Sequence, residues 1–268
     1  MNAAAQFLDI PADAAVDFPA RRLAYAARAG KEPAIVWMGG FRSDMTSTKA
    51  MKLEEAASAE GRASLRFDYS AHGESSGDFA TATLSQWLGD ALHMIREKGG
   101  KKPVIVGSSM GGWLALRAAQ ILAAEGNPPG GLVLIAPAVD FTEALMWAQF
   151  PETIRRQIME EGVWYRPSEY SPEPYPITKA LIEDGRRHLL LGKALKFGVP
   201  IHILQGGQDP DVPLAHVERF VAELAQDDVR MTVIPDGNHR LSRDEDIETL
   251  QRITMALAAE VGACSPNR

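Results

Sequence analysis

The chain has 268 residues, of which 46% are hydrophobic and 24% charged, and its formal net charge at pH 7 is −7. This length can bury one large core, and the balance of residue types is that of an ordinary globular protein. The acidic balance argues against binding to nucleic-acid phosphates, and no Lys/Arg cluster suggests an anionic membrane surface. We therefore expect no nucleic-acid partner, while composition leaves the oligomeric state open.

The cysteine content and the N-terminal residues indicate in which cellular compartment the protein is expected. Cys264 is the only cysteine, so the fold needs no internal disulfide and no oxidising compartment. The N-terminal stretch carries Asp9, Asp13 and Asp17 and lacks the basic segment and apolar core of a signal peptide. No stretch approaches the roughly 18 uncharged apolar residues of a membrane span. These features predict a cytoplasmic protein without a membrane span.

Short apolar runs alternate along the chain with longer segments of helical spacing. Near-continuous apolar runs are typical of parallel strands that are covered on both faces. Their alternation with helices predicts an α/β fold with a mostly parallel sheet, in a single domain covering residues 1–268. In chain order, the predicted strands are 34–38, 63–67, 103–107, 131–136, 200–206 and 229–234, and the predicted helices are 46–61, 84–100, 113–126, 213–226 and 244–261.

One interval breaks this alternation. About 60 residues separate the runs 131–136 and 200–206, which is too many for a single crossover helix. The interval is rich in aromatic residues and Pro, and we interpret residues 138–195 as an inserted helical lid. Two of its aromatic residues, Trp147 and Trp164, are candidates for lining an apolar substrate pocket. The alternative is a peripheral elaboration whose aromatic residues only pack on the sheet.

The stretch Gly107-Ser108-Ser109-Met110-Gly111 matches G-x-S-x-G, the pattern of a nucleophile elbow. The pattern needs a sharp strand-to-helix turn, and small residues two positions on either side of the serine allow it. A predicted strand precedes the pentapeptide and a predicted helix follows it. We therefore predict that Ser109 is a nucleophile and that the Met110 amide, at the helix start, faces a developing oxyanion. The alternative is a tight turn in which Ser109 has no catalytic role.

A serine nucleophile needs a base that a third group orients, and with this elbow the chain order is serine, acid, histidine. His239 follows the last predicted strand and is the candidate base. Asp209 stands three residues after Gly206, at the end of the preceding strand, and is the candidate acid. Asp211 is the fallback for this role, and Asp140 is a weaker third choice.

Two further loops contribute candidates. Gly39 and Gly40 follow the first predicted strand and permit close approach, so the Phe41 amide is the candidate second oxyanion donor and Gly40 a candidate substrate contact; the alternative is a simple turn. His72 precedes the serine and is therefore not the base, but its glycine-rich loop is expected to shape the site and contact substrate. The remaining histidines lie in helical stretches (His93 and His188), near a helix start (His216) or in a strand (His202), and they are expected to be structural.

These residues resemble the α/β-hydrolase superfamily, and more narrowly the branch that contains mitochondrial palmitoyl-protein thioesterases. The resemblance spans about residues 35 to 245 and is carried by RFDYSAHGESSG, GSSMGGW, EGVWYRPSEYS, GGQDPDVP and NHRLS. It implies Ser109 as nucleophile, Asp209 as acid and His239 as base, with the Phe41 and Met110 amides as the oxyanion hole. It also implies an ester or thioester substrate, including those with long acyl chains.

The sequence thus predicts a serine hydrolase of carboxylic esters or thioesters that works through an acyl-enzyme and acts on a small-molecule substrate. We expect no cofactor and no metal, because the sequence holds no metal-spaced His/Cys/Glu cluster, no Walker A loop and no G-x-G-x-x-G after a strand. Two alternatives stay open. The same fold can serve as a ligand-binding receptor with little turnover, and the same triad serves peptidases and carbon–carbon bond hydrolases.

Overall fold

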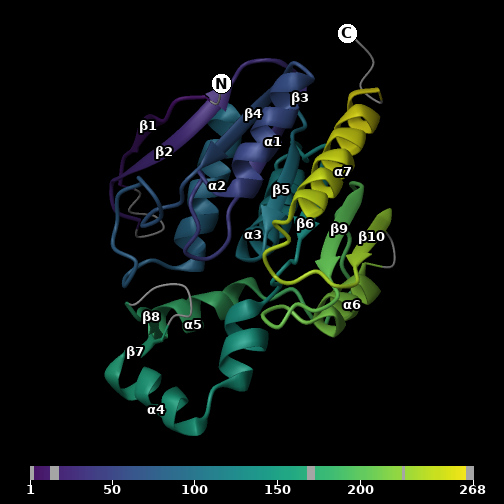
Figure 1. Ribbon diagram of the computed structural model, residues 1–268. Coiled ribbons are helices and arrows are strands. Elements are labelled where there is room, and N and C mark those ends of the chain that lie inside the picture. The colour runs from purple at the N-terminus through teal and green to yellow at the C-terminus, as the bar shows by residue number, and fades with distance from the viewer. Residues whose placement is uncertain (1–2, 13–17, 168–172, 225–226, 264–268) are drawn as a thin grey trace.

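An eight-stranded sheet forms the centre of the computed structural model, which describes residues 3–12, 18–167, 173–224 and 227–263 (Figure 1). The strands are β1 (Gln6–Ile10), β2 (Arg21–Arg28), β3 (Lys31–Met38), β4 (Arg62–Phe67), β5 (Val104–Ser108), β6 (Gly131–Ile135), β9 (Ile201–Gly206) and β10 (Val229–Ile234). Their spatial order is β1-β2-β4-β3-β5-β6-β9-β10. From β4 to β10 all neighbours pair in parallel, whereas β2 pairs antiparallel with β1 and β4. The predicted mostly parallel sheet is confirmed.

Helices cover both faces of the sheet. On one face lie α1 (Thr48–Ala59) and α7 (Asp244–Ala263), and on the other lie α2 (Leu84–Lys98), α3 (Met110–Ala124) and α6 (Leu214–Glu223). The five helices predicted from apolar spacing are therefore confirmed. Within the described ranges, none of the helices combines the length and the apolar character that crossing a bilayer requires.

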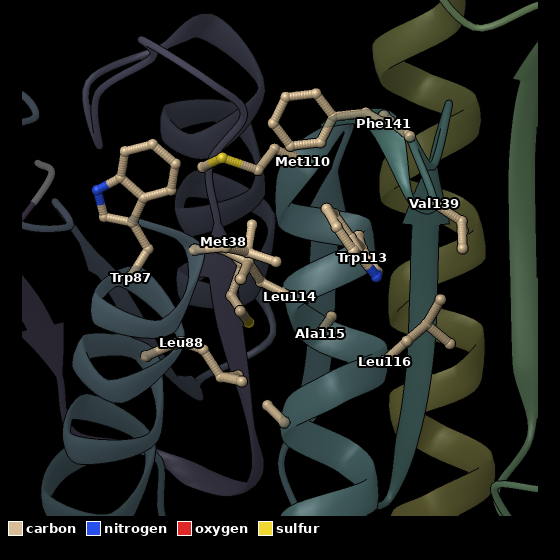
Figure 2. Close-up of a cluster of buried hydrophobic side chains, with 14 of the residues drawn as sticks. Met38, Trp87, Leu88, Met110, Trp113, Leu114, Ala115, Leu116, Val139 and Phe141 are labelled. Carbon is tan, nitrogen blue, oxygen red and sulfur yellow. The ribbon is translucent and has the colours of Figure 1, made fainter. Parts of the chain in front are cut away.

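The larger part of the core lies between the sheet and the α2–α3 pair. Leu84, Leu88 and Ile95 share one face of α2 and are buried there. Figure 2 shows the indoles of Trp87 and Trp113 in this layer, and both are fully buried. Burial of an aromatic side chain of this size contributes roughly 2–3 kcal/mol, so this layer fixes α3, and with it the residues that precede α3, against the sheet.

The segment 138–195 is here called the insertion, and its described residues, 138–167 and 173–195, lie beyond the carboxyl ends of the parallel strands (Figure 1). Helical turns at Thr142–Met146, Trp147–Gln149 and Arg186–His188 accompany α4 (Glu152–Glu161) and α5 (Lys179–Gly185), with an antiparallel pair formed by β7 (Val163–Arg166) and β8 (Tyr175–Thr178). The predicted helical insertion therefore also contains a short strand pair, which helical spacing did not predict. The residues of β7 and β8 are mostly aromatic or β-branched, which favours strands over helix.

Candidate active site

Ser109 sits at the turn between β5 and α3, with φ 54° and ψ −119°. A positive φ is unfavourable for a residue with a side chain and costs about 1–3 kcal/mol, so the surrounding structure must hold it. The Ser109 amide donates to the Ile135 carbonyl at 2.8 Å, and the Ser109 carbonyl accepts from the Gly112 and Ala138 amides at 2.9 and 3.1 Å. Hydrogen bonds from β6, α3 and the start of the insertion therefore lock the turn that presents the Ser109 side chain.

The two glycines of the pentapeptide are required by close backbone approach. A Cβ on Gly107 would lie 2.4 Å from the Gly111 carbonyl oxygen, and a Cβ on Gly111 would lie 2.2 Å from the Met38 carbonyl oxygen. A Cβ atom essentially never comes this close to an atom to which it is not bonded, so β3, β5 and α3 can meet only because both positions lack a side chain. The G-x-S-x-G spacing is thus a packing requirement of this turn.

We expect Gly111→Ala to lower the free energy of unfolding by about 2–3 kcal/mol, because the added methyl group forces apart buried backbone that cannot move freely. Urea unfolding followed by circular dichroism measures this loss. Gly262→Ala in α7 is the matched control. A Cβ on Gly262 would meet its nearest neighbour, Pro33 Cδ, at 3.4 Å, and alanine favours helix, so stability should hold or rise. Equal urea midpoints for Gly111→Ala and the wild type would contradict the packing argument.

The structure brings Ser109, Asp209 and His239 together from three loops, which follow β5, β9 and β10. His239 Nε2 lies 3.1 Å from Ser109 Oγ, and His239 Nδ1 lies 2.8 Å from Asp209 Oδ2. Both distances fit hydrogen bonds in which the hydroxyl donates to Nε2 and Nδ1–H donates to the carboxylate. This arrangement can remove the hydroxyl proton and hold the imidazole in the tautomer that accepts it.

Backbone hydrogen bonds hold the Asp209 carboxylate in place, in addition to its contact with His239. Its side chain is fully buried, and Oδ1 accepts from the amides of Asp211 and Val212, each at 2.9 Å. Gly206 lets the two loops touch, because a Cβ there would lie 2.5 Å from the Gly237 carbonyl oxygen. Asp209, Asp211 and His239 offer ligand atoms within 4.8 Å of one another, the spacing of a metal site. However, both Asp209 oxygens already have hydrogen-bond partners, which fits an orienting acid.

Neither of the two alternative acids is the hydrogen-bond partner of His239. Asp211 is exposed and lines the cavity described below, and it is Asp209 that pairs with His239. Asp140 is buried, and its carboxylate accepts from the Leu190 and Leu191 amides at 2.8 to 3.0 Å. Burial raises the pKa of the Asp140 carboxyl. Asp140 therefore joins the beginning and the end of the insertion, and it does not contact the base.

The predicted oxyanion donors flank the serine. A Cβ on Gly40 would lie 3.4 Å from Ser109 Cβ, so the backbone that leads into Phe41 passes directly against the nucleophile. Met110 is the first residue of α3, where the helix dipole favours negative charge. In the part of the chain that the structure describes, neither the Phe41 nor the Met110 amide donates a hydrogen bond. Both amides are therefore available to an oxyanion.

A cavity of about 870 Å³ opens at Ser109 and His239, between the sheet and the insertion. Part of its lining is apolar and comes from the elbow, from residues 39–43 after β3 (here called the oxyanion loop) and from the insertion: Phe41, Met110, Ala138, Phe141, Leu145 and Met146. A second part is polar and comes from the start of α1 and the loop after β10: Ser47, Thr48, Lys49, Arg240 and Ser242. The Lys49 ammonium donates to the Arg240 carbonyl and to Ser242 Oγ, so this polar part adjoins His239.

Of the predicted substrate contacts, Gly40 lines the cavity, whereas His72, Trp147 and Trp164 do not. The Trp147 ring faces the guanidinium groups of Arg155 and Arg186 at 5.6 and 5.1 Å, and the Trp164 ring packs edge-on against Phe150 at 5.2 Å. His72 is buried behind the oxyanion loop. The structure places these three residues outside the lining of this cavity, and their contact with substrate stays a prediction.

Several lining residues were missed from the sequence. Leu145 and Met146 are apolar residues of the insertion, and this composition is the signal that could have made them candidates, although spacing does not show which way they point. Lys49 gave no such signal, because only the fold places the start of α1 beside the loop after β10. Burial and the neighbouring Arg240 charge lower the pKa of Lys49 to about 8. Lys49 is thus still mostly a cation at neutral pH, beside the histidine.

Known proteins match most of this chain in sequence. The sequence profile of the family described as "Alpha/beta hydrolase family" matches residues 33–250. The human protein named palmitoyl-protein thioesterase ABHD10, mitochondrial, is 35% identical over 230 residues, which cover 85% of this chain and 74% of that protein. The bovine protein of the same name is 34% identical over 229 residues, with coverage of 85% and 74%.

Solved structures are similar over nearly the whole chain. A crystal structure of a protein from Agrobacterium vitis S4 superposes with a TM-score of 0.90 at 40% identity, covering 96% of this chain and all of that one. Mouse alpha/beta hydrolase domain-containing protein 10 superposes with a TM-score of 0.85 at 29% identity, covering 97% of this chain and all of that one. The likeness therefore extends beyond the sheet to the insertion.

Proposed function

This chain belongs to the alpha/beta hydrolase family, and we propose that it is a serine hydrolase that cleaves carboxylic esters or thioesters. The observation that carries the proposal is the hydrogen-bonded series from Asp209 through His239 to Ser109 Oγ at the floor of a cavity. The relatives named palmitoyl-protein thioesterases support the choice of acyl substrates. The proposed activity requires a nucleophile, a base, an orienting acid and oxyanion donors, and this chain offers a candidate for each.

In the first half-reaction, Ser109 Oγ attacks the acyl carbonyl carbon while His239 Nε2 takes the hydroxyl proton. The Asp209 carboxylate stabilises the imidazolium that forms. The carbonyl oxygen becomes an oxyanion and accepts hydrogen bonds from the Phe41 and Met110 amides, each worth about 3 kcal/mol in the transition state. His239 then gives its proton to the leaving oxygen or sulfur, the carbon–heteroatom bond breaks, and the acyl group remains on Ser109.

In the second half-reaction, water replaces the alcohol or thiol. His239 Nε2 takes a proton from the water, whose oxygen attacks the acyl-enzyme carbonyl. The same two amides stabilise the second oxyanion. The bond to Ser109 Oγ then breaks as His239 returns the proton to it, and the carboxylic acid is released.

The polar and apolar parts of the cavity lining would contact different parts of the substrate. A leaving group must lie near His239 to receive its proton, so it would contact the polar lining beside Lys49 and Ser242. The acyl chain would then lie on the apolar lining that includes Phe141, Leu145 and Met146. Because the insertion supplies much of the apolar lining, we propose that residues 138–195 act as the lid over the acyl chain.

Hydrolysis of p-nitrophenyl esters from acetyl to palmitoyl, beside S-acyl N-acetylcysteamine thioesters of the same lengths, tests the proposal. We expect turnover in at least one series, with a chain-length optimum that reports the length of the apolar lining. Complete inactivity in both series, with the fold confirmed by circular dichroism, would reject it. Slow single labelling of Ser109 by a fluorophosphonate without turnover would instead favour a receptor role. Cleavage confined to peptides or carbon–carbon bonds would favour the other alternative.

A further inference from the structure

The oxyanion loop contains a turn with an unfavourable residue at its third position. The Ser43 amide donates to the Gly40 carbonyl at 3.1 Å, which closes a four-residue turn from Gly40 to Ser43. Arg42, the third residue, has φ 58°. A positive φ at this position is the mark of a type II turn, which favours glycine or asparagine there. An arginine therefore needs an external contact to hold this form against the commoner type I turn.

The conformation of this turn bears on the Phe41 amide. The peptide bond is planar, so the Gly40 carbonyl and the Phe41 N–H point in opposite directions. Because the Gly40 carbonyl points into the turn, the Phe41 N–H points out of it, on a backbone that passes against Ser109. The next peptide, between Phe41 and Arg42, is the one that would flip if the turn relaxed to type I. A flip there rotates about the Phe41 Cα–C bond and leaves the Gly40 carbonyl in the turn, so it would act on the Phe41 amide by shifting the Phe41 backbone against Ser109.

His72 supplies the external contact. The Arg42 amide donates to His72 Nε2 at 3.1 Å, and His72 Nδ1 donates to the Ser70 carbonyl at 3.1 Å. The His72 ring is buried against Tyr69, Phe79 and Trp87, with ring centroids 5.2 to 5.6 Å away. The ring is thus fixed on every side, with one nitrogen aimed at the turn.

We propose that His72 is a positioning residue for the oxyanion hole, because its hydrogen bond from the Arg42 amide fixes the turn that directs the Phe41 amide at the reacting carbonyl. The inference rests on the function proposed above. It differs from the substrate contact that the sequence suggested, since His72 acts here through Phe41 and does not touch substrate. Trp87 supports the same arrangement, because its Nε1–H donates to the Ser70 carbonyl that also accepts from His72.

The protonation state of His72 suits this role. Burial, the largest effect, and the charge of Arg42 lower the pKa of His72 to about 4, against opposing effects of the Ser70 carbonyl and Asp44. The imidazole is therefore neutral at neutral pH, with its proton on Nδ1 and a free lone pair on Nε2. A neutral ring can accept from the Arg42 amide, whereas an imidazolium cannot.

Three substitutions of His72 distinguish the effect of its hydrogen-bond acceptor from the effect of the volume of its ring. The His72→Gln side chain can place an oxygen close to the position of Nε2, His72→Asn is too short to do so, and His72→Leu fills space without an acceptor. With p-nitrophenyl butyrate as substrate, we expect His72→Asn and His72→Leu to lower kcat by about 100-fold, with KM changed by less than about 3-fold. His72→Gln should stay within about 5-fold of the wild-type kcat, because it keeps the acceptor.

A second readout reports the oxyanion hole itself. Butylboronic acid adds to the serine oxygen and forms a tetrahedral boronate anion, which places a B–OH oxygen where the oxyanion forms, so its affinity should fall by the same factor as kcat/KM. Arg42→Gly in the His72→Leu background should recover at least about 10-fold of kcat, because glycine adopts a positive φ without strain. Tyr69→Phe is the control: its ring contacts His72, and its hydroxyl has no hydrogen-bond partner among the described residues.

The outcomes are distinguishable. The positioning role stands under two conditions. The wild type must turn over the ester, and kcat and boronate affinity must both fall in His72→Asn and His72→Leu but not in His72→Gln. If wild-type, His72→Gln and His72→Asn proteins agree in both quantities, or if losses appear in stability alone, the role is overturned while the hydrolase function remains. If the wild type has no turnover, the proposed function fails and this inference fails with it. Should His72→Leu not fold, the comparison of His72→Gln with His72→Asn decides.

Discussion

Ser109→Ala is expected to lower kcat for ester or thioester hydrolysis by about 10⁶-fold, to the level that the oxyanion hole and binding alone sustain. The reason is that His239 Nε2 faces Ser109 Oγ at 3.1 Å, and alanine removes the atom that forms the acyl-enzyme. Steady-state hydrolysis of p-nitrophenyl butyrate measures the loss. Labelling by a fluorophosphonate, followed by mass spectrometry of the intact protein, should disappear in the same variant.

The neighbouring serine provides the matched control for this experiment. Ser108 ends β5, one residue before the elbow, and it is the Oγ of Ser109 that His239 contacts. Ser108→Ala should therefore keep kcat within about 10-fold of the wild type and should still be labelled. Thermal unfolding of Ser109→Ala should resemble that of the wild type, since alanine bears the same backbone strain at φ 54°. Full activity in Ser109→Ala would refute the assignment of the nucleophile.

The catalytic candidates could be found from the sequence because each follows a buried strand. Parallel strands end at one edge of a sheet, so residues just after β5, β9 and β10 must lie near one another. Ser109, Asp209 and His239 were selected by this rule, and the structure brings them within hydrogen-bond distance. The rule also ranks Asp209 above Asp211 by its spacing from β9, and the structure pairs Asp209 with the histidine.

The N-terminal strands β1 and β2 were not predicted. β1 is short and mostly exposed, and β2 contains Arg and Ala where a central strand would hold β-branched residues. β2 pairs with β4, which lies about 40 residues later in the chain, so no local pattern could reveal this pairing, and β1 joins the sheet through β2. Strands at the edge of a sheet carry a weaker sequence signal than central ones, because one side has no partner to specify.

The sequence also could not predict which way the side chains of the insertion point. Thr142–Met146 forms a π-helical turn and Trp147–Gln149 a 3₁₀ turn, and neither has 3.6 residues per turn. Helical spacing therefore cannot tell which side chains face the cavity. Leu145 and Met146 line it, whereas Trp147 turns toward Arg155 and Arg186. His72 presents the same difficulty in a loop, where only the tertiary structure shows that its ring faces the Arg42 amide.

Asp209→Asn is expected to lower kcat by about 10⁴-fold while leaving the fold intact. The carboxylate accepts from the Asp211 and Val212 amides through Oδ1 and from His239 Nδ1–H through Oδ2. An asparagine has one acceptor oxygen, which the two backbone amides would hold, so its NH₂ group would face the histidine. His239 would then accept at Nδ1 and carry its proton on Nε2, the tautomer that cannot take a proton from Ser109.

The kcat of Asp209→Asn and Asp211→Asn with p-nitrophenyl butyrate, beside urea unfolding of both, tests this account. Asp211 is exposed and accepts nothing from the base, so Asp211→Asn should lower kcat by less than about 10-fold. The tautomer argument predicts that Asp209→Asn loses kcat with little change in KM, since the cavity lining is untouched. If Asp211→Asn proves the more damaging change, the orienting carboxylate is misassigned and the loop after β9 must rearrange when substrate binds.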